Sequence, residues 1–217
     1  MIILKNISKS FDSLQVLKDI SLQINDAEIV SISGMSGAGK TTLLNIMGTL
    51  DKADSGEIIV NGKDITGLSD KELSAFRNKE IGFVFQFHHL LTEFTALENA
   101  IMPALICGIN EKEASIKARE LFELLGIKGK EESFPNELSG GEQQRVAIIR
   151  ALINSPSVVL ADEPTGNLDS QNAKALFDLF FVLRDKLHQT FVIVTHAKDL
   201  SARCDRELII SDGKILK

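Results

Sequence analysis

The sequence predicts an α/β fold built on a parallel β-sheet, with small antiparallel additions and an inserted group of helices. Short apolar runs rich in β-branched residues recur along the chain, and such runs are typical of strands buried on both faces. Helical patterns separate these runs, which favours parallel strands joined by helices. The dipeptides Asn61-Gly62 and Asp212-Gly213 predict tight turns between antiparallel strands, outside the parallel core.

Each predicted strand is an apolar run bounded by turn residues. The strands cover residues 28–33, 81–85, 157–161, 191–195 and 207–211, and the helices cover 40–48, 111–126, 142–153 and 171–187. The stretch 87–155 shows helical patterns and no convincing strand. We therefore predict one domain over residues 1–217, in which 1–86 and 156–217 form the core with its β additions and 87–155 form an inserted helical subdomain.

Composition narrows the class of protein. The net charge of −6 argues against a general nucleic-acid binder, because such domains usually carry a basic excess on one face. Cys107 and Cys204 form neither a metal-ligand pattern nor a disulfide framework, which is typical of a reducing compartment. The first ten residues lack a signal-peptide core, and the apolar stretch 101–109 is about half a membrane span. We therefore expect a cytoplasmic protein that does not itself cross a bilayer.

The string GMSGAGKT, residues 34–41, predicts a phosphate-binding loop. Glycines let a backbone fold tightly enough for its N–H groups to point at phosphate oxygens, and the following helix adds the positive end of its dipole. A chance glycine-rich turn is the alternative, but a predicted strand precedes this string and a predicted helix follows it. The candidate nucleotide-binding residues here are Gly34, Ser36, Gly37, Gly39, Lys40, Thr41 and Thr42.

An acidic pair follows the predicted strand 157–161. Asp162 and Glu163 come at the carboxyl end of that strand, which is the edge where α/β sheets bind ligands. Asp162 is placed to hold Mg²⁺ through its water shell, and Glu163 is placed to orient an attacking water. The alternative is an ordinary strand end before a proline turn, and the phosphate loop argues against it.

The string LSGGEQQR, residues 138–145, predicts a second phosphate-binding end in the same chain. Ser139 offers a hydroxyl group, and Gly140 and Gly141 leave N–H groups uncovered at the start of a helix. With this string the sequence resembles the nucleotide-binding subunits of ABC transporters, whose signature is LSGGE followed by QQR. The resemblance spans the whole chain and implies a P-loop NTPase (RecA-like) parallel sheet core with an antiparallel β subdomain and an inserted α-helical subdomain.

The resemblance implies ATP and Mg²⁺ as cofactors and hydrolysis of ATP as the activity. It implies that Thr41, Gln86 and Asp162 bind Mg²⁺, and that Gln86 belongs to the glutamine loop of the family. It implies that Glu163 is the catalytic carboxylate and that His196, which follows the string FVIVT, contacts the γ-phosphate.

Four further residues match nucleotide contacts of the family. Phe11 matches the aromatic residue that stacks on adenine, although a position in the core is the alternative. Ser139 and Gly141 match groups that reach the γ-phosphate of the ATP on the other subunit. Asp169, in the string GNLD, matches the D-loop. The resemblance thus implies a head-to-tail homodimer that closes on two ATP molecules and opens after hydrolysis.

The resemblance implies an integral membrane permease as partner, contacted through about residues 87–107, the segment after Gln86. This segment, with the string DEPTGNLD, resembles the ATPases that release lipoproteins from the bacterial inner membrane, which implies a place on the cytoplasmic side of that membrane. Export of macrolides or peptides and cell division are alternatives within the family. A soluble ABC ATPase without transport and a non-hydrolysing nucleotide-binding module are alternatives outside it.

Phe87, Leu90, Leu91 and Phe94 are four large apolar residues within eight positions. We expect them to form a groove for a short cytoplasmic helix of the permease, because exposed apolar patches often mark partner contacts. Packing into the helical subdomain is the alternative.

At two positions the residue differs from the one that is usual in the family that the sequence resembles. Thr92 stands where the lipoprotein-releasing branch tends to have proline. Ala27 stands where the family usually has glycine, and this predicts a turn that avoids a positive φ angle.

Overall fold

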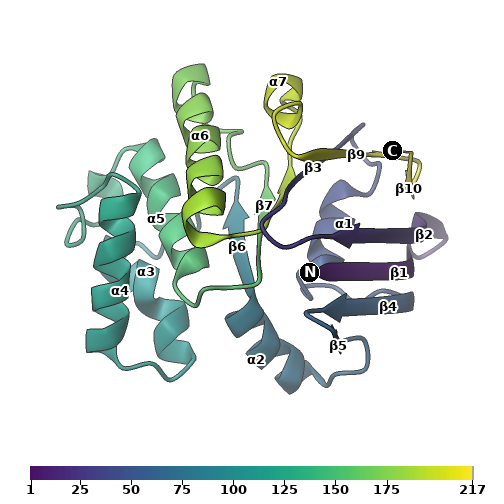
Figure 1. Ribbon diagram of the computed structural model, residues 1–217, viewed down its shortest axis with the longest axis horizontal. Helices are drawn as coiled ribbons and strands as arrows, with labels where there is room; N and C mark the ends of the chain where they lie inside the picture. Colours follow the sequence, from purple (N-terminus) through teal and green to yellow (C-terminus); the bar gives the residue numbers. More distant parts are fainter. Residues whose placement is uncertain (217) are drawn as a thin grey trace.

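Two β-sheets frame the protein in the computed structural model, which describes residues 1–216 (Figure 1). The larger sheet has the strand order β10-β9-β3-β8-β7-β6. Its strands are β3 (Ile29–Gly34), β6 (Ile81–Phe85), β7 (Val158–Asp162), β8 (Phe191–Val194), β9 (Arg206–Ser211) and β10 (Lys214–Ile215). All neighbours pair in parallel except β10, which is antiparallel to β9. The five predicted strands of the parallel core are confirmed.

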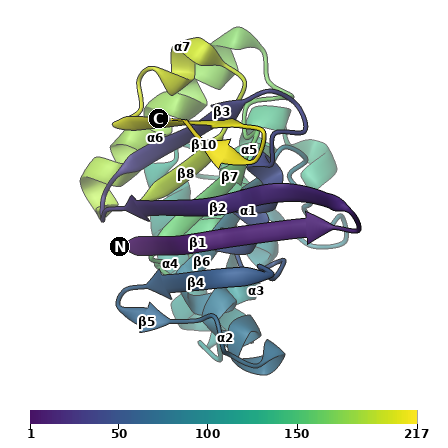
Figure 2. The same ribbon diagram turned by 90° about the vertical axis from the view of Figure 1, so that its right-hand side faces the viewer.

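The smaller sheet is antiparallel, with the order β2-β1-β4-β5, and lies beside the larger one (Figure 2). Its strands are β1 (Ile2–Phe11), β2 (Leu14–Ile24), β4 (Ser55–Val60) and β5 (Lys63–Asp64). The predicted hairpin turns are both present, β4 to β5 through Asn61-Gly62 and β9 to β10 through Asp212-Gly213. All four turn residues have φ between 48° and 77°, as a type I′ turn requires.

The helices surround the larger sheet. They are α1 (Lys40–Met47), α2 (Asp70–Glu80), α3 (Ala96–Ile106), α4 (Glu111–Leu124), α5 (Gly140–Leu152), α6 (Ser170–Leu187) and α7 (Lys198–Ser201), with a 3₁₀ turn at Pro135–Glu137. Figure 1 shows α3, α4 and α5 grouped together, and between residues 86 and 157 the described chain has no strand. None of the helices in residues 1–216 is both long enough and apolar enough to span a bilayer.

Alternate residues of the parallel strands face two separate apolar clusters. Val159 and Ala161 of β7 pack with α3, α5 and α6, whereas Leu160 packs with α1 and the small sheet. Both faces of β7 are therefore dry, which explains the continuous apolar run in its sequence. A large aliphatic side chain buried in this way contributes about 1.5–3 kcal/mol of transfer free energy.

The prediction that the turn before β3 avoids positive φ is wrong. Ala27 has φ +54°. Its N–H donates to Thr190 Oγ1 at 3.0 Å, so contacts with the start of β8 hold the turn in place. The left-handed conformation costs a non-glycine residue about 1–2 kcal/mol, and the contacts of the turn must offset this cost.

Candidate active site

The carboxyl ends of four parallel strands meet at one edge of the larger sheet. Direct pairing places in one row Phe85 of β6, Asp162 of β7, Val194 of β8 and Ile32 of β3. The segments that follow these strands emerge together, at the edge where α/β sheets bind ligands. The predicted phosphate loop, the acidic pair and His196 all lie at the ends of these strands or in the segments that follow them.

The glycines of the phosphate loop have conformations and spaces that a side chain would disrupt. Gly37 and Gly39 have φ of 77° and 103°. A Cβ atom at Gly39 would lie 2.8 Å from Leu17 Cδ2, and one at Gly34 would lie 2.2 Å from the carbonyl oxygen of Ile210. The loop is therefore held tightly between β2 and β9, with its backbone constrained as phosphate binding requires.

Lys40 opens α1 and is only 6% exposed. Its Nζ donates to the carbonyl oxygens of Gly34 and Met35, at 3.0 and 2.9 Å. In the described part of the chain no side chain caps the start of α1, so the first N–H groups of this helix face the loop that Lys40 spans. Thr41 and Thr42 stand in the first turn, and the exposed Ser36 lies in the loop itself. A free helix N-terminus beside a lysine suits an anion.

Asp162 presents a carboxylate that fits a hard cation. Its Oδ1 atom is buried and has no hydrogen-bond partner within residues 1–216. Burial raises the pKa of Asp162 above its ordinary value, and Thr41 and Lys40 oppose that rise. An orphaned carboxylate oxygen beside a threonine hydroxyl matches the oxygen ligands of Mg²⁺, which is commonly held by one or two protein oxygens plus phosphates. Within residues 1–216 no group of three His, Cys, Asp or Glu side chains could hold a metal alone.

Glu163 and His196 contact each other at this edge. His196 Nε2 lies 3.1 Å from Glu163 Oε1. Glu163 has φ +48°, and its N–H donates to the carbonyl oxygen of Val194 at 3.0 Å. The left-handed backbone turns the side chain out of the line of β7, which leaves it 23% exposed. A strained glutamate with an ordering histidine is suited to hold a water molecule.

Gln86 bonds to a residue that the sequence prediction did not name. Its Nε2 donates to Asn167 Oδ1 at 3.2 Å, and Asn167 Nδ2 donates to the backbone oxygen of Gln86 at 3.1 Å. Asn167 belongs to the same GNLD string that contains Asp169, but a contact across 81 residues leaves no sequence pattern. Asp169 caps α6 instead, with its Oδ1 accepting from the N–H of Asn172 at 2.8 Å.

Ser139 and Gly141 stand at the start of α5, apart from the phosphate loop. Ser139 Oγ and Glu142 form a capping box, in which each side chain bonds the other residue's backbone N–H. A Cβ atom at Gly141 would meet only Asn172 within 4 Å. Figure 1 shows α5 beside α3 and α4, with α1 on the other side of β6 and β7. Within residues 1–216, no hydrogen bond joins Ser139 to the phosphate loop of its own chain.

Phe11 ends β1 and is 47% exposed, so it does not lie in the core. Lys9 Nζ lies 5.2 Å from the centre of its ring. Because a Cβ atom at Gly39 would meet Val16 and Leu17, β2 lies against the phosphate loop near the turn that joins it to β1. Phe11 therefore presents an open aromatic face near the predicted phosphate site.

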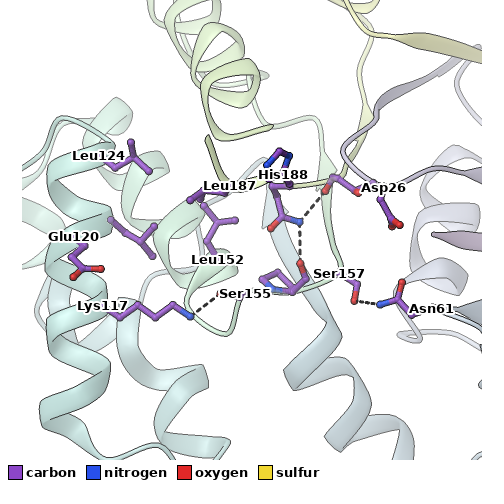
Figure 3. A pocket seen from close by; sticks show the side chains of 14 residues that line it. Asp26, Asn61, Lys117, Glu120, Leu124, Leu152, Ser155, Ser157, Leu187 and His188 are labelled. Atoms are coloured by element: carbon purple, nitrogen blue, oxygen red, sulfur yellow. Dashed lines mark hydrogen bonds between the residues drawn. The ribbon is translucent and has the colours of Figure 1, made fainter. Parts of the chain in front are cut away.

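A cavity of about 400 Å³ lies at the opposite end of the strands (Figure 3). Ser157 and Thr190, which precede β7 and β8, line it together with Leu152 and Leu187. Lys117 donates to Ser155 Oγ at 2.8 Å across its rim. None of the predicted site residues is among the described residues that line it.

A groove of about 500 Å³ runs between α2, β6, α3 and α5. Apolar side chains line it, and so do two arginines: Leu50, Ile81, Phe83, Phe85, Pro103, Ile106, Arg77 and Arg150. The four residues predicted to form a groove do not line this one. Phe87, Leu91 and Phe94 are 64%, 42% and 39% exposed beside it, whereas Leu90 packs against the apolar core.

Comparisons with known proteins agree with this geometry. The family described as ABC transporter matches residues 17–166. The lipoprotein-releasing system ATP-binding protein LolD of Bacteroides fragilis is 59% identical over 216 residues, covering 100% of both chains. LolD of Bordetella pertussis is 50% identical over 202 residues, covering 93% of this chain and 87% of its own.

Solved structures of ABC cassettes share the fold. The dimeric structure of MJ0796, a bacterial ABC transporter cassette, has a TM-score of 0.90 and 38% identity, covering 100% of this chain and 97% of its own. The post-hydrolysis state of the same cassette bound to ADP and Pi has a TM-score of 0.89 and 37% identity, with the same coverage. The predicted fold class is confirmed.

Proposed function

The chain belongs to the ABC transporter family and is an ATP-hydrolysing, ATP-binding subunit, and on this premise we propose that it drives lipoprotein release from the bacterial inner membrane. The contact between Glu163 and His196, at the same strand edge as Lys40 and Asp162, carries the hydrolytic part of the proposal. The full-length similarity to relatives named lipoprotein-releasing supports lipoproteins as the cargo.

In the proposed site the phosphate loop and α1 hold the phosphates of ATP. Lys40 exchanges its bonds to the loop carbonyls for phosphate oxygens. Thr41, Asp162 and Gln86 would hold Mg²⁺, which would supply positive charge to the phosphates. Glu163 orients the attacking water and accepts its proton, and the N–H of His196 Nε2 fixes the Glu163 carboxylate. Phe11 offers its exposed face to the base.

The site is completed by a second copy of the chain. Ser139 and Gly141 expose a helix N-terminus that does not meet the phosphate loop of its own chain, and such an end favours an anion. In a head-to-tail dimer each signature segment covers the ATP of the partner. The likeness to a dimeric cassette supports this arrangement. Residues 1–86 and 156–217 then form the ATP-binding core, and 87–155 form the helical subdomain.

The permease docks in the groove between α2 and α3, with residues 87–107 on one side. A protein gains nothing by exposing Phe87, Leu91 and Ile106 unless a partner covers them. Among the described residues that line the groove are Arg77 and Arg150 but no carboxylate, so the docking segment carries an acidic residue beside its apolar ones. The ATPase thereby sits on the cytoplasmic side of the inner membrane, attached through this partner.

A matched pair of variants tests the docking. Ile106 and Ile116 are both exposed helix residues, but only Ile106 lines the groove. Ile106→Asp should abolish co-purification with the permease while the ATPase activity of the isolated protein persists. Ile116→Asp should leave both unchanged. Retained co-purification of Ile106→Asp would place the permease contact elsewhere.

Transport by the complex of this protein with its permease tests the identity of the cargo. Inner-membrane vesicles that hold the complex should release lipoprotein on addition of MgATP. Extrusion of macrolides or peptides instead, or a cell-division defect without lipoprotein retention, would assign the chain to another branch of the family.

A further inference from the structure

We propose that Asn167 is a positioning residue that orients the side-chain amide of Gln86 and ties it to the loop that carries Glu163. The inference rests on the proposed function, in which Gln86 contacts Mg²⁺ and nucleotide. Asn167 itself touches neither in this proposal and acts only through Gln86.

Two hydrogen bonds in opposite directions join Gln86 and Asn167. Gln86 Nε2 donates to Asn167 Oδ1 at 3.2 Å, and Asn167 Nδ2 donates to the Gln86 backbone oxygen at 3.1 Å. One bond uses the acceptor of the Asn167 amide and the other uses its donor. A flipped Asn167 amide would satisfy neither bond, so the pair has one favourable arrangement.

This arrangement selects the end of Gln86 that faces a cation. Asn167 occupies the amide nitrogen of Gln86, which leaves the carbonyl oxygen Oε1 as the end directed to other contacts. Hard cations such as Mg²⁺ bind oxygen and not an amide N–H₂ group. Without Asn167 the Gln86 amide would sample both orientations, and only one of them could contact the metal.

The glycine before Asn167 makes room for this contact. A Cβ atom at Gly166 would lie 2.7 Å from Gln86 Nε2 and 3.0 Å from its Cδ. The N–H of Gly166 donates to the backbone oxygen of Glu163 at 3.0 Å. Hydrogen bonds thus join Gln86, which follows β6, to the turn that begins with Glu163, which follows β7. Movement of one of these two segments would therefore displace the other.

The experiment is a double-mutant cycle with Asn167→Ala, Gln86→Ala and both changes together. Gln171→Ala is the control, because Gln171 is exposed at the start of α6 and its side chain makes no hydrogen bond within residues 1–216. We expect Asn167→Ala to lower kcat about tenfold, within the range that misplacement of a contact group costs. It should also raise the Mg²⁺ concentration for half-maximal activity. The double variant should be no worse than Gln86→Ala alone.

Two readouts do not depend on turnover. The side-chain amide resonances of Gln86 in the nucleotide-free protein should shift in Asn167→Ala and stay in place in Gln171→Ala. The gain in ATP affinity on adding Mg²⁺, measured by calorimetry, should shrink in Asn167→Ala and Gln86→Ala alike. If Asn167→Ala does not fold, Asn167→Asp enters the same cycle, since it keeps the shape and the acceptor and loses the donor to the Gln86 backbone.

The outcomes separate this inference from the proposed function. Normal Mg²⁺ dependence of Gln86→Ala would remove Gln86 from the metal site, and the positioning role would fall with it. An impaired Gln86→Ala beside a normal Asn167→Ala would overturn the positioning role alone. Additive losses in the double variant would show that Asn167 acts independently of the Gln86 side chain, which also overturns the positioning role.

Discussion

His196 Nε2 lies 3.1 Å from Glu163 Oε1, although 33 positions of the chain separate the two residues. The contact exists because β7 and β8 are parallel neighbours, so the residues that follow them emerge side by side. The left-handed backbone of Glu163 then turns its carboxylate toward the histidine. In the proposed mechanism this contact holds the Glu163 carboxylate in place for the attacking water.

Glu163→Gln should lose turnover by a factor of about 100 or more, because an amide cannot accept the proton of the attacking water. Binding of ATP should persist, since Glu163 does not belong to the phosphate loop. Single-turnover hydrolysis and equilibrium nucleotide binding measure the two properties separately. Glu120→Gln, an exposed carboxylate at the far cavity, is the control. Near-normal hydrolysis by Glu163→Gln would remove this residue from the mechanism.

Asp162→Asn should stabilise the nucleotide-free protein at neutral pH while weakening its Mg²⁺ dependence. Burial raises the pKa of Asp162, so the folded state binds its proton more tightly than the unfolded chain. The stability from this group is therefore full below the unfolded pKa and is lost as pH rises through the folded pKa. The gain from Asn should be at most about 1 kcal/mol for this half-buried carboxylate, and should vanish in acid. Thermal melts across pH check this, and a gain that grows toward low pH would contradict it.

Ser139→Arg should abolish hydrolysis and leave ATP binding by the monomer nearly intact, because a large cation blocks closure of the dimer. Removing the cap itself costs about 0.5–2 kcal/mol of stability. Ser69→Arg is a matched control, since Ser69 caps α2 with the same capping box and lies outside the predicted site.

Wild-type ATPase activity should rise more than linearly with protein concentration. Strictly linear activity down to high dilution would speak against a shared site.

Phe11→Ala should weaken ATP and GTP binding together. An aromatic face stacks on any purine, and loss of one stacked base contact costs about 1–3 kcal/mol. The wild type should then distinguish ATP from GTP by about tenfold or less. Competition binding with the two nucleotides measures this. Strong rejection of GTP would require a polar group that reads the adenine edge.

The parts of the fold that rest on local pattern were predictable. The apolar runs of β3 and β7 and the Asn61-Gly62 turn each carry their own signal, because burial on both faces and positive φ restrict the residues allowed. The tight conformation of residues 34–41 was predictable for the same reason, since only glycine tolerates the positions of Gly34 and Gly39.

Features that depend on tertiary contacts were not predictable. Ala27 adopts positive φ because Thr190, far along the chain, bonds its N–H. Leu90 and Leu91 are adjacent and equally apolar, yet one packs on the core and the other is exposed. The bonds between Gln86 and Asn167 join two segments whose approach is set only by the pairing of β6 with β7.

Lipoprotein release by the reconstituted complex tests the central claim most directly. Proteoliposomes that contain the permease, this ATPase and a lipoprotein should release the lipoprotein only with MgATP. Release should fail with Glu163→Gln even though the complex assembles and binds ATP. Release that continues with Glu163→Gln, or MgATP hydrolysis by the wild-type complex without any release, would contradict the account.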